Sequence, residues 1–161
     1  MWMRTAILAA LLGTALAAQT GYDKFLTAAD VQKAAGAAGV KVVPRGSRTG
    51  AGGDLNFVGS DDQLLLMVSF GNAQSFKKAR DTKEMDVGGQ KYPMVLFAHA
   101  VDGLGDEAFA APPGPVQYVI YARKGNQSVA ATTYFQKGST TKTRLSEAQL
   151  KDVVKTIFSR M

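Results

Sequence analysis

The C-terminal residues carry the pattern that most constrains this fold, an apolar stripe with helical spacing. Large apolar side chains stand at offsets 0, 3, 4, 7, 8 and 11 from position 150. They are Leu150, Val153, Val154, Ile157, Phe158 and Met161. Because such a stripe occupies one face of a helix and must be buried, we expect it to cover a sheet. The preceding Leu145 to Leu150 predicts the start of the helix, with Ser146 as its cap and Gln149 returning the bond.

A second helix opening occurs near the start of the chain. Thr27 can cap the free amides, Asp30 can return the bond, and Leu26 can pack on Val31. We predict that this helix runs to about Ala38 and leaves through Gly39 in the left-handed conformation. A third, shorter helix is predicted from Asn72, its cap, to Arg80, with Phe76 facing inward, and Gly88-Gly89 closes the linker behind it.

Six segments have the composition of strands. Residues 54–58 and 63–70 form one expected hairpin, and residues 116–122 and 128–135 form a second around Gly125-Asn126. Residues 41–43 form a short strand, and the continuous apolar run from Met94 to Val101 predicts a central one. This order predicts an α+β domain, with an antiparallel sheet of about six strands and helices packed on it.

The N-terminus has the three parts of an export signal. Arg4 precedes a short apolar run, and Ala15-Leu16-Ala17 forms a small-residue cleavage site. A buried or membrane-resting helix is the alternative. We expect residues 1–17 to be a signal peptide cleaved near Ala17 and residues 18–161 to form a single domain. Position 19 is Gln rather than the Cys of a lipoprotein box, so we expect a periplasmic or secreted protein without a permanent membrane anchor.

The composition of the chain excludes several kinds of chemical site. The chain has no cysteine, which excludes disulfides, thiolate zinc sites and cysteine nucleophiles. Nineteen Lys and Arg stand against thirteen Asp and Glu, for a net charge of +6. The excess is modest, and acidic residues lie within the first basic cluster, so we expect a solvated surface. We expect no nucleic-acid partner, because the chain has an export signal. Attachment to anionic envelope polymers is the alternative, through Lys77, Lys78, Arg80, Arg123 and Lys124.

Two segments are candidate binding sites. The loop from Arg45 to Gly53 holds four glycines and few apolar residues, and residues 102–107 hold three carboxylates and two glycines. The second segment lacks the ligand pattern of a calcium loop, and its charge is wrong for a phosphate. A tight structural turn is the alternative for it. Our candidate ligand- or partner-binding residues are Arg45, Arg48, Asp102, Asp106 and Glu107, and we expect no metal or cofactor.

His99 is the single histidine. Within an apolar run, such a residue is more often packed or at a strand edge than catalytic. No G-x-S-x-G surrounds any serine, so a hydrolase would need His99 and a distant carboxylate brought close by folding.

Several of these segments together resemble a known type of protein. They are L-T-x-x-D-V at 26–31, Asp54-Leu55-Asn56-Phe57, V-x-G-L-G-D-E-A-F at 101–109, the two closing strands and the terminal L-S-x-x-Q-L helix. The pattern is similar to small exported bacterial proteins of uncharacterised function, and only the G-L-G-D-x-A-F element is specific. Their resemblance to the Mog1/PsbP-like α/β/α sandwich implies helices on both faces of an antiparallel sheet, and implies no enzyme activity or cofactor.

These observations predict an exported, non-enzymatic binding or interaction domain of the bacterial cell envelope. Its partner would be an envelope protein or a small ligand, bound by the Arg45 to Gly53 loop and the turn at residues 102–107. The alternatives are an envelope hydrolase with a dispersed site and an electrostatic binder of anionic envelope polymers.

Overall fold

A computed structural model describes residues 21–46, 52–115 and 117–161. The expected signal peptide, residues 1–17, and the candidate residue Arg48 lie outside these ranges.

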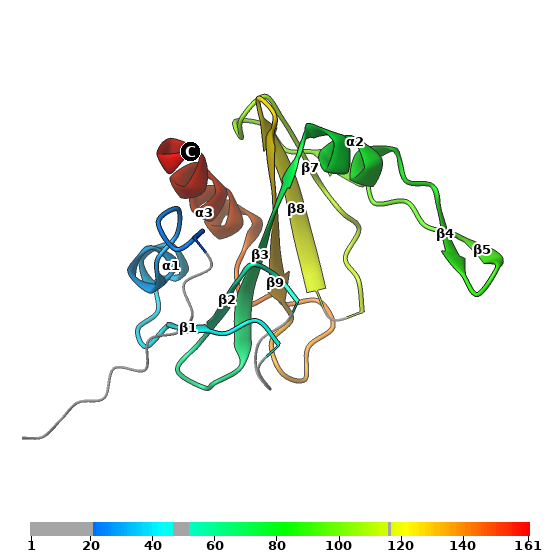
Figure 1. Cartoon of the computed structure of the whole chain (residues 1–161). Coiled ribbons are helices and arrows are strands. Elements are labelled where there is room, and N and C mark those ends of the chain that lie inside the picture. Colours follow the sequence, from blue (N-terminus) through cyan, green and yellow to red (C-terminus); the bar gives the residue numbers. More distant parts are fainter. Residues whose placement is uncertain (1–20, 47–51, 116) are drawn as a thin grey trace, which may run out of the picture.

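The described residues form an α+β structure built on one large antiparallel sheet (Figure 1). Within the described ranges this sheet has seven strands in the order β1-β2-β3-β9-β8-β7-β6. Their bounds are β1 Lys41–Val43, β2 Leu55–Val58, β3 Leu64–Asn72, β6 His99–Ala100, β7 Glu107–Ala110, β8 Gln117–Lys124 and β9 Gln127–Tyr134. Both predicted hairpins are confirmed, because β2 pairs with β3 and β8 pairs with β9.

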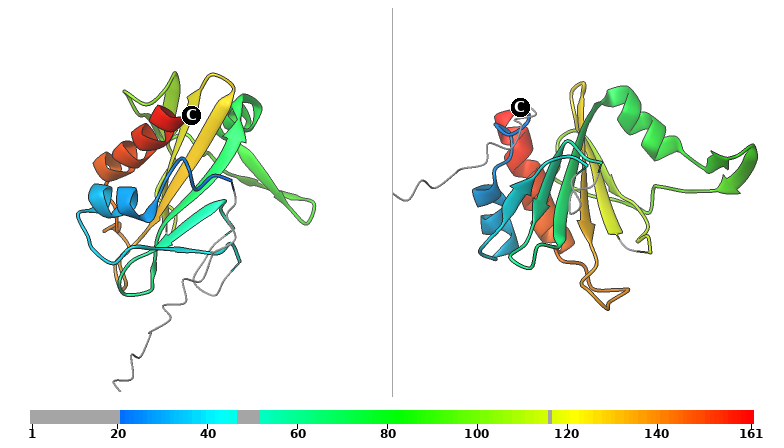
Figure 2. Two further views of the ribbon diagram at one scale, coloured as in Figure 1. Left: turned by 60° about the vertical axis from the view of Figure 1, so that its left-hand side comes forward. Right: turned by 60° about the horizontal axis from the view of Figure 1, so that its bottom comes forward.

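Helices cover both faces of the sheet. Figure 2 shows α1, Ala28–Ala35, and α3, Glu147–Arg160, on one face, and α2, Ala73–Asp81, on the other. The alternation along β8 follows this division, since Ile120 belongs to the core under α1 and α3 while Tyr121 lies on the face of α2. None of the helices in the described part of the chain is long and apolar enough to cross a membrane.

The predicted terminal helix is confirmed. Ser146 accepts a hydrogen bond from the Gln149 amide, and the Gln149 side chain accepts one from the Ser146 amide. The stripe is buried against the sheet, and Leu150, Val154 and Ile157 are all 0% exposed. Burying several large aliphatic side chains at about 1.5–3 kcal/mol each makes this contact a main source of stability.

The first helix begins as predicted and ends earlier. Thr27 and Asp30 form the capping box, but the helix stops at Ala35 rather than near Ala38. Gly36 takes the left-handed conformation, with φ of 63°, and the Ala37 amide donates to the Gln32 carbonyl. The first available glycine therefore ends the helix, and Gly39, with φ of 77°, turns the chain toward β1.

The prediction of a central strand at Met94 to Val101 is wrong. Only His99 and Ala100 pair in this segment, and β6 lies at the edge of the sheet. Val95 and Phe97 are 54% and 40% exposed, and Val101, 5% exposed, is the one buried residue of this run. The inner position belongs to β7, in a segment whose sequence predicted only a turn. The linker at Gly88-Gly89 is likewise a hairpin of two strands, β4 Glu84–Val87 and β5 Gln90–Pro93.

One ion pair joins the ends of the domain and predicts a pH dependence. Arg160 of α3 donates to both carboxylate oxygens of Asp30 at 2.6 and 2.7 Å, and this contact holds the pKa of Asp30 well below its usual range. Its stabilisation is therefore complete above about pH 4, the pKa of an unfolded Asp, and is lost as the pH falls toward the lower folded value. We expect Arg160→Met to lower the melting temperature by a few degrees at pH 6, and the difference from wild type to shrink between pH 4 and pH 2 in thermal scans. A difference that stays constant over this range would assign the effect to packing of the Arg160 stem.

Candidate functional site

The acidic turn at residues 102–107 is built into the sheet. Leu104 is only 2% exposed and belongs to the core. The Asp106 amide donates to the Arg123 carbonyl at 2.7 Å, and Oδ2 of Asp106 accepts from the Gly125 amide at 2.7 Å. Asp106 thus closes the end of the β8–β9 hairpin with both its backbone and its carboxylate.

Glu107 ties α2 to the sheet. Its Oε1 accepts a hydrogen bond from Arg80 of α2 at 2.7 Å, and its Oε2 lies 3.8 Å from Arg123. Asp102 is exposed at the outer side of the turn. Two of the three candidate carboxylates in this segment therefore have structural partners, which is the arrangement that the alternative of a tight structural turn anticipates.

Arg45 lies at the opposite edge of the sheet. It follows the edge strand β1, and its guanidinium is 3.8 Å from the carboxylate of Asp54. The turn at residues 102–107 connects β6 and β7 at the other edge, with five strands from β2 to β7 between β1 and β6. The structure therefore does not bring Arg45 together with Asp102, Asp106 and Glu107 on one surface.

Four of the five basic residues considered for polyanion binding have partners, namely Lys77, Arg80, Arg123 and Lys124. Lys77 bonds to Asp81, and Arg80 bonds to Asp81 and Glu107. Lys124 donates to the carbonyl of Phe158 at 2.7 Å. Since these cations already have anionic or carbonyl partners, they form a weaker polyanion surface than their number in the sequence indicates.

His99 is an exposed strand-edge residue with a carboxylate beside it. Its Nε2 is 3.2 Å from Oε2 of Glu147, at the first turn of α3, and the Tyr118 hydroxyl donates to the same oxygen at 2.6 Å. The Tyr118 hydrogen bond, with a contribution from His99, lowers the pKa of Glu147, so this side chain is a carboxylate at neutral pH. Burial and the Glu147 contact raise the pKa of Tyr118. No sequence pattern links Glu147 to His99, because 48 positions separate the two residues.

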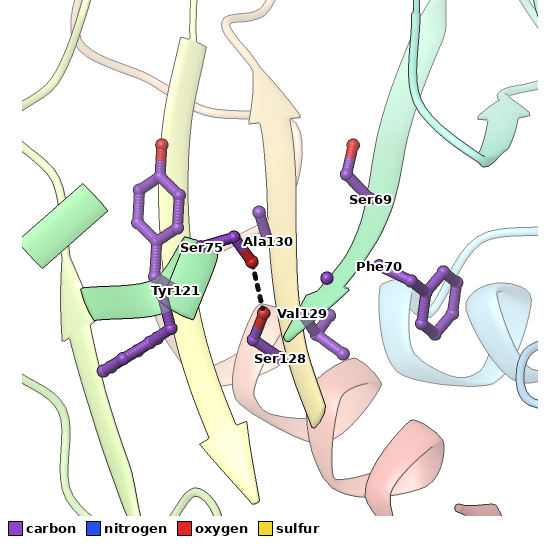
Figure 3. A pocket seen from close by; sticks show the side chains of 9 residues that line it. Ser69, Phe70, Ser75, Tyr121, Ser128, Val129 and Ala130 are labelled. Carbon is purple, nitrogen blue, oxygen red and sulfur yellow. Dashed lines mark hydrogen bonds between the residues drawn. The ribbon is translucent and has the colours of Figure 1, made fainter. Parts of the chain in front are cut away.

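A small hollow of about 160 Å³ lies between α2 and the sheet (Figure 3). Ser75 and Ser128 face each other there, with their hydroxyls 3.4 Å apart. Both hydroxyls also donate to the carbonyl of Asn72, at 2.8 and 3.0 Å. His99 lies on the other face of the sheet, so no imidazole stands beside this pair, and we assign it to fixing the start of α2.

Within the described residues, the hairpin of β4 and β5, residues 84–93, lies apart from the body, and we call it the arm. Figures 1 and 2 show it reaching away from the sheet and its helices. Gly88 and Gly89 both have positive φ, 63° and 84°, as the two-residue turn of a hairpin requires. Every residue of both strands is exposed.

The arm has one apolar face and one charged face. Met85 pairs with Tyr92 in the register, and Val87 lies on the same side of the ribbon as both. Met85 is 45% exposed, Tyr92 is 47% exposed and Val87 is 52% exposed. The opposite face carries the ion pair of Glu84 and Lys91. Beside the root of the arm, a mainly apolar groove of about 520 Å³ runs between residues 94–96 and residues 111–115.

Comparisons with known proteins identify no relative whose site could be compared with this one. No protein-family model, no curated protein and no solved structure matches this chain. Among the described residues, no group of three or more His, Asp or Glu side chains is arranged to hold a metal ion.

Proposed function

We propose that this protein is an exported interaction domain of the bacterial cell envelope and that its arm binds a partner protein. The observation that carries the proposal is the exposed apolar face of Met85, Val87 and Tyr92 on a ribbon that projects from the body. Isolated two-stranded hairpins are marginally stable in water, and contiguous exposed apolar surface marks a contact site. A partner that covers this face would stabilise the arm and remove the apolar surface from water.

The shape of the arm favours a protein over a small ligand. A two-stranded ribbon has no concavity to enclose a small molecule, whereas its apolar face and charged rim match the composition of protein interfaces. Both edges of the ribbon can also pair with an added strand. Val95, 54% exposed, and the groove beside it extend the apolar surface from the arm onto the body.

The proposal also includes the cellular location of the protein and its assignment to the Mog1/PsbP-like fold. The export pattern of residues 1–17 supports delivery to the periplasm or medium. Helices on both faces of an antiparallel sheet support a Mog1/PsbP-like sandwich, in which the arm is an insertion between α2 and β6. Mass spectrometry of protein from its native host should find the chain beginning near Ala18 in the periplasm or medium. An intact N-terminus in the cytosolic fraction would contradict export.

Site-specific photo-crosslinking in the native host tests the contact surface. We expect a photoreactive phenylalanine analogue at position 87 to give a discrete adduct with one envelope protein, and the same analogue at Asp152, on the outer side of α3, to give none. Adducts of equal yield from both positions, or none from position 87, would overturn the proposal. An adduct at twice the mass of the chain would replace the envelope partner with a second copy of this protein.

An envelope hydrolase is the second candidate, and the contact of His99 with Glu147 favours it. A carboxylate that holds Nε2 can orient the ring so that Nδ1 acts as a general base. Hydrolysis of p-nitrophenyl esters and of purified peptidoglycan, measured for wild type and His99→Ala, separates the candidates. A hydrolase would lose its turnover in the His99→Ala variant. An interaction domain would show no hydrolysis above that of buffer, either as wild type or as the variant.

A further inference from the structure

A second cavity, on the side of α1 and α3, has the lining of a binding site. Its volume is about 400 Å³, within the range of small-molecule pockets. Its wall is formed by β8, the start of α3, the chain between β9 and α3, and Pro113. The lining residues are Pro113, Tyr118, Phe135, Thr140, Thr141, Thr143 and Glu147.

The single formal charge in this lining is negative. Both hydrogen bonds that Glu147 accepts fall on Oε2, from Tyr118 and His99. Within the described residues no hydrogen bond uses Oε1, so this oxygen has its lone pairs available to a ligand. The lowered pKa of Glu147 keeps the group ionised at neutral pH. Lys151, one turn along α3, interacts with this carboxylate but does not line the cavity.

The rest of the lining suits a cation with an apolar stem. The rings of Tyr118 and Phe135 border the cavity, and aromatic faces attract ammonium groups. Three threonine hydroxyls, of Thr140, Thr141 and Thr143, can accept further N–H bonds. An anionic ligand would meet the Glu147 carboxylate without a lining cation to offset the repulsion.

We propose that this cavity binds a primary ammonium group carried on a short aliphatic chain, with Glu147 as its counter-ion. The ammonium donates to Oε1 of Glu147 and to threonine hydroxyls, and the aliphatic chain lies against Pro113 and Phe135. Tyr118 and His99 are positioning residues, because they hold Oε2 and so direct Oε1 into the cavity. The site is independent of the arm, which lies beyond the opposite face of the sheet.

NMR titration of the whole mature chain at pH 8 with pentylammonium, 1-pentanol and pentanoate tests this assignment. We expect saturable shifts of the Thr140, Thr141 and Thr143 methyl signals with pentylammonium, at least about tenfold weaker binding of the alcohol, and none of pentanoate. Nα-acetyl-lysine methylamide, titrated in parallel, distinguishes a lysine side chain from a free amine as the source of the group.

Two matched variants complete the test. Glu147→Gln should weaken pentylammonium binding at least about tenfold, whereas Glu84→Gln, which removes a carboxylate from the arm, should leave it unchanged. Melting scans of each variant verify folding, and Tyr118→Phe provides a second test if Glu147→Gln unfolds, with a smaller loss expected. Equal binding of pentylammonium and pentanol, or undiminished binding to a folded Glu147→Gln, would overturn the proposal.

Discussion

Replacing Phe109 with alanine is expected to lower the free energy of unfolding by about 3–5 kcal/mol. Phe109 is 0% exposed and stands at the centre of an aromatic cluster. The centroid of its ring lies 5.3 Å from the ring centroid of Phe76 on α2, 4.9 Å from that of Tyr121 on β8 and 5.5 Å from that of Phe97. Truncation leaves a cavity that these partners can fill only if α2 shifts toward the sheet.

Urea unfolding of wild type and Phe109→Ala measures the loss. Phe97→Ala is the matched control, because it removes a ring from the same cluster at a position that is 40% exposed. We expect it to cost about 1 kcal/mol or less, in keeping with its exposure. Similar losses for both variants would show that Phe109 does not anchor the cluster.

Replacing Gly105 with alanine should cost at least about 3 kcal/mol, although it adds a single methyl group. Gly105 has φ of 58°, and a Cβ there would lie 2.3 Å from the backbone carbonyl oxygen of Arg123 and 3.0 Å from the Phe158 ring. The carbonyl cannot withdraw without breaking its hydrogen bond with the Asp106 amide. The substitution therefore forces the acidic turn away from the β8–β9 hairpin.

Gly103 is the control for backbone strain. It lies in the same turn with φ of 78°, and nothing stands within 4 Å of the position its Cβ would take. Gly103→Ala should cost only about 1–2 kcal/mol, the strain of the left-handed conformation. Thermal or urea unfolding of the pair separates strain from steric overlap, and equal losses would contradict the close approach of Gly105 to Arg123.

Features with local causes could be predicted from the sequence. The capping boxes at Thr27, Asn72 and Ser146 form between residues three positions apart, so each helix start follows from its own few residues. The stripe of the last helix predicted its buried face for the same reason. The hairpin of β8 and β9 follows from two strand-like runs and the Gly125 turn between them.

Features that depend on distant partners could not be predicted from the sequence. Met94 to Val101 has the composition of a buried strand, but β7 pairs with β8 and leaves the run at the edge with Val101 alone buried. Gly88-Gly89 is a signal for a hairpin turn, but the strands beside it mix apolar with charged or polar residues, and every residue in them is exposed. The arm therefore had no core pattern to reveal it.

The candidate site shows the same division. The G-L-G-D-x-A-F element is distinctive in the sequence, but the contacts that account for Leu104, Gly105 and Asp106 come from β8, from Gly125 and from the core. The sequence could identify the segment as unusual without showing which partners it meets. The proximity of His99 to Glu147 likewise arises only when α3 packs beside the edge of the sheet.

Partner binding and stability, measured on two variants, test the role of the arm most directly. Met85→Ser with Val87→Ser removes apolar groups from the arm, and Asp106→Asn weakens the carboxylate contact that closes the hairpin of β8 and β9. With a crosslinker at Tyr92, we predict that the arm variant loses the partner adduct and keeps the wild-type melting temperature. Asp106→Asn should melt several degrees lower and keep the adduct at temperatures where it is folded. The reverse result, in which Asp106→Asn abolishes the adduct at unchanged stability and the arm variant retains it, would place the partner at the acidic turn and contradict the proposed role of the arm.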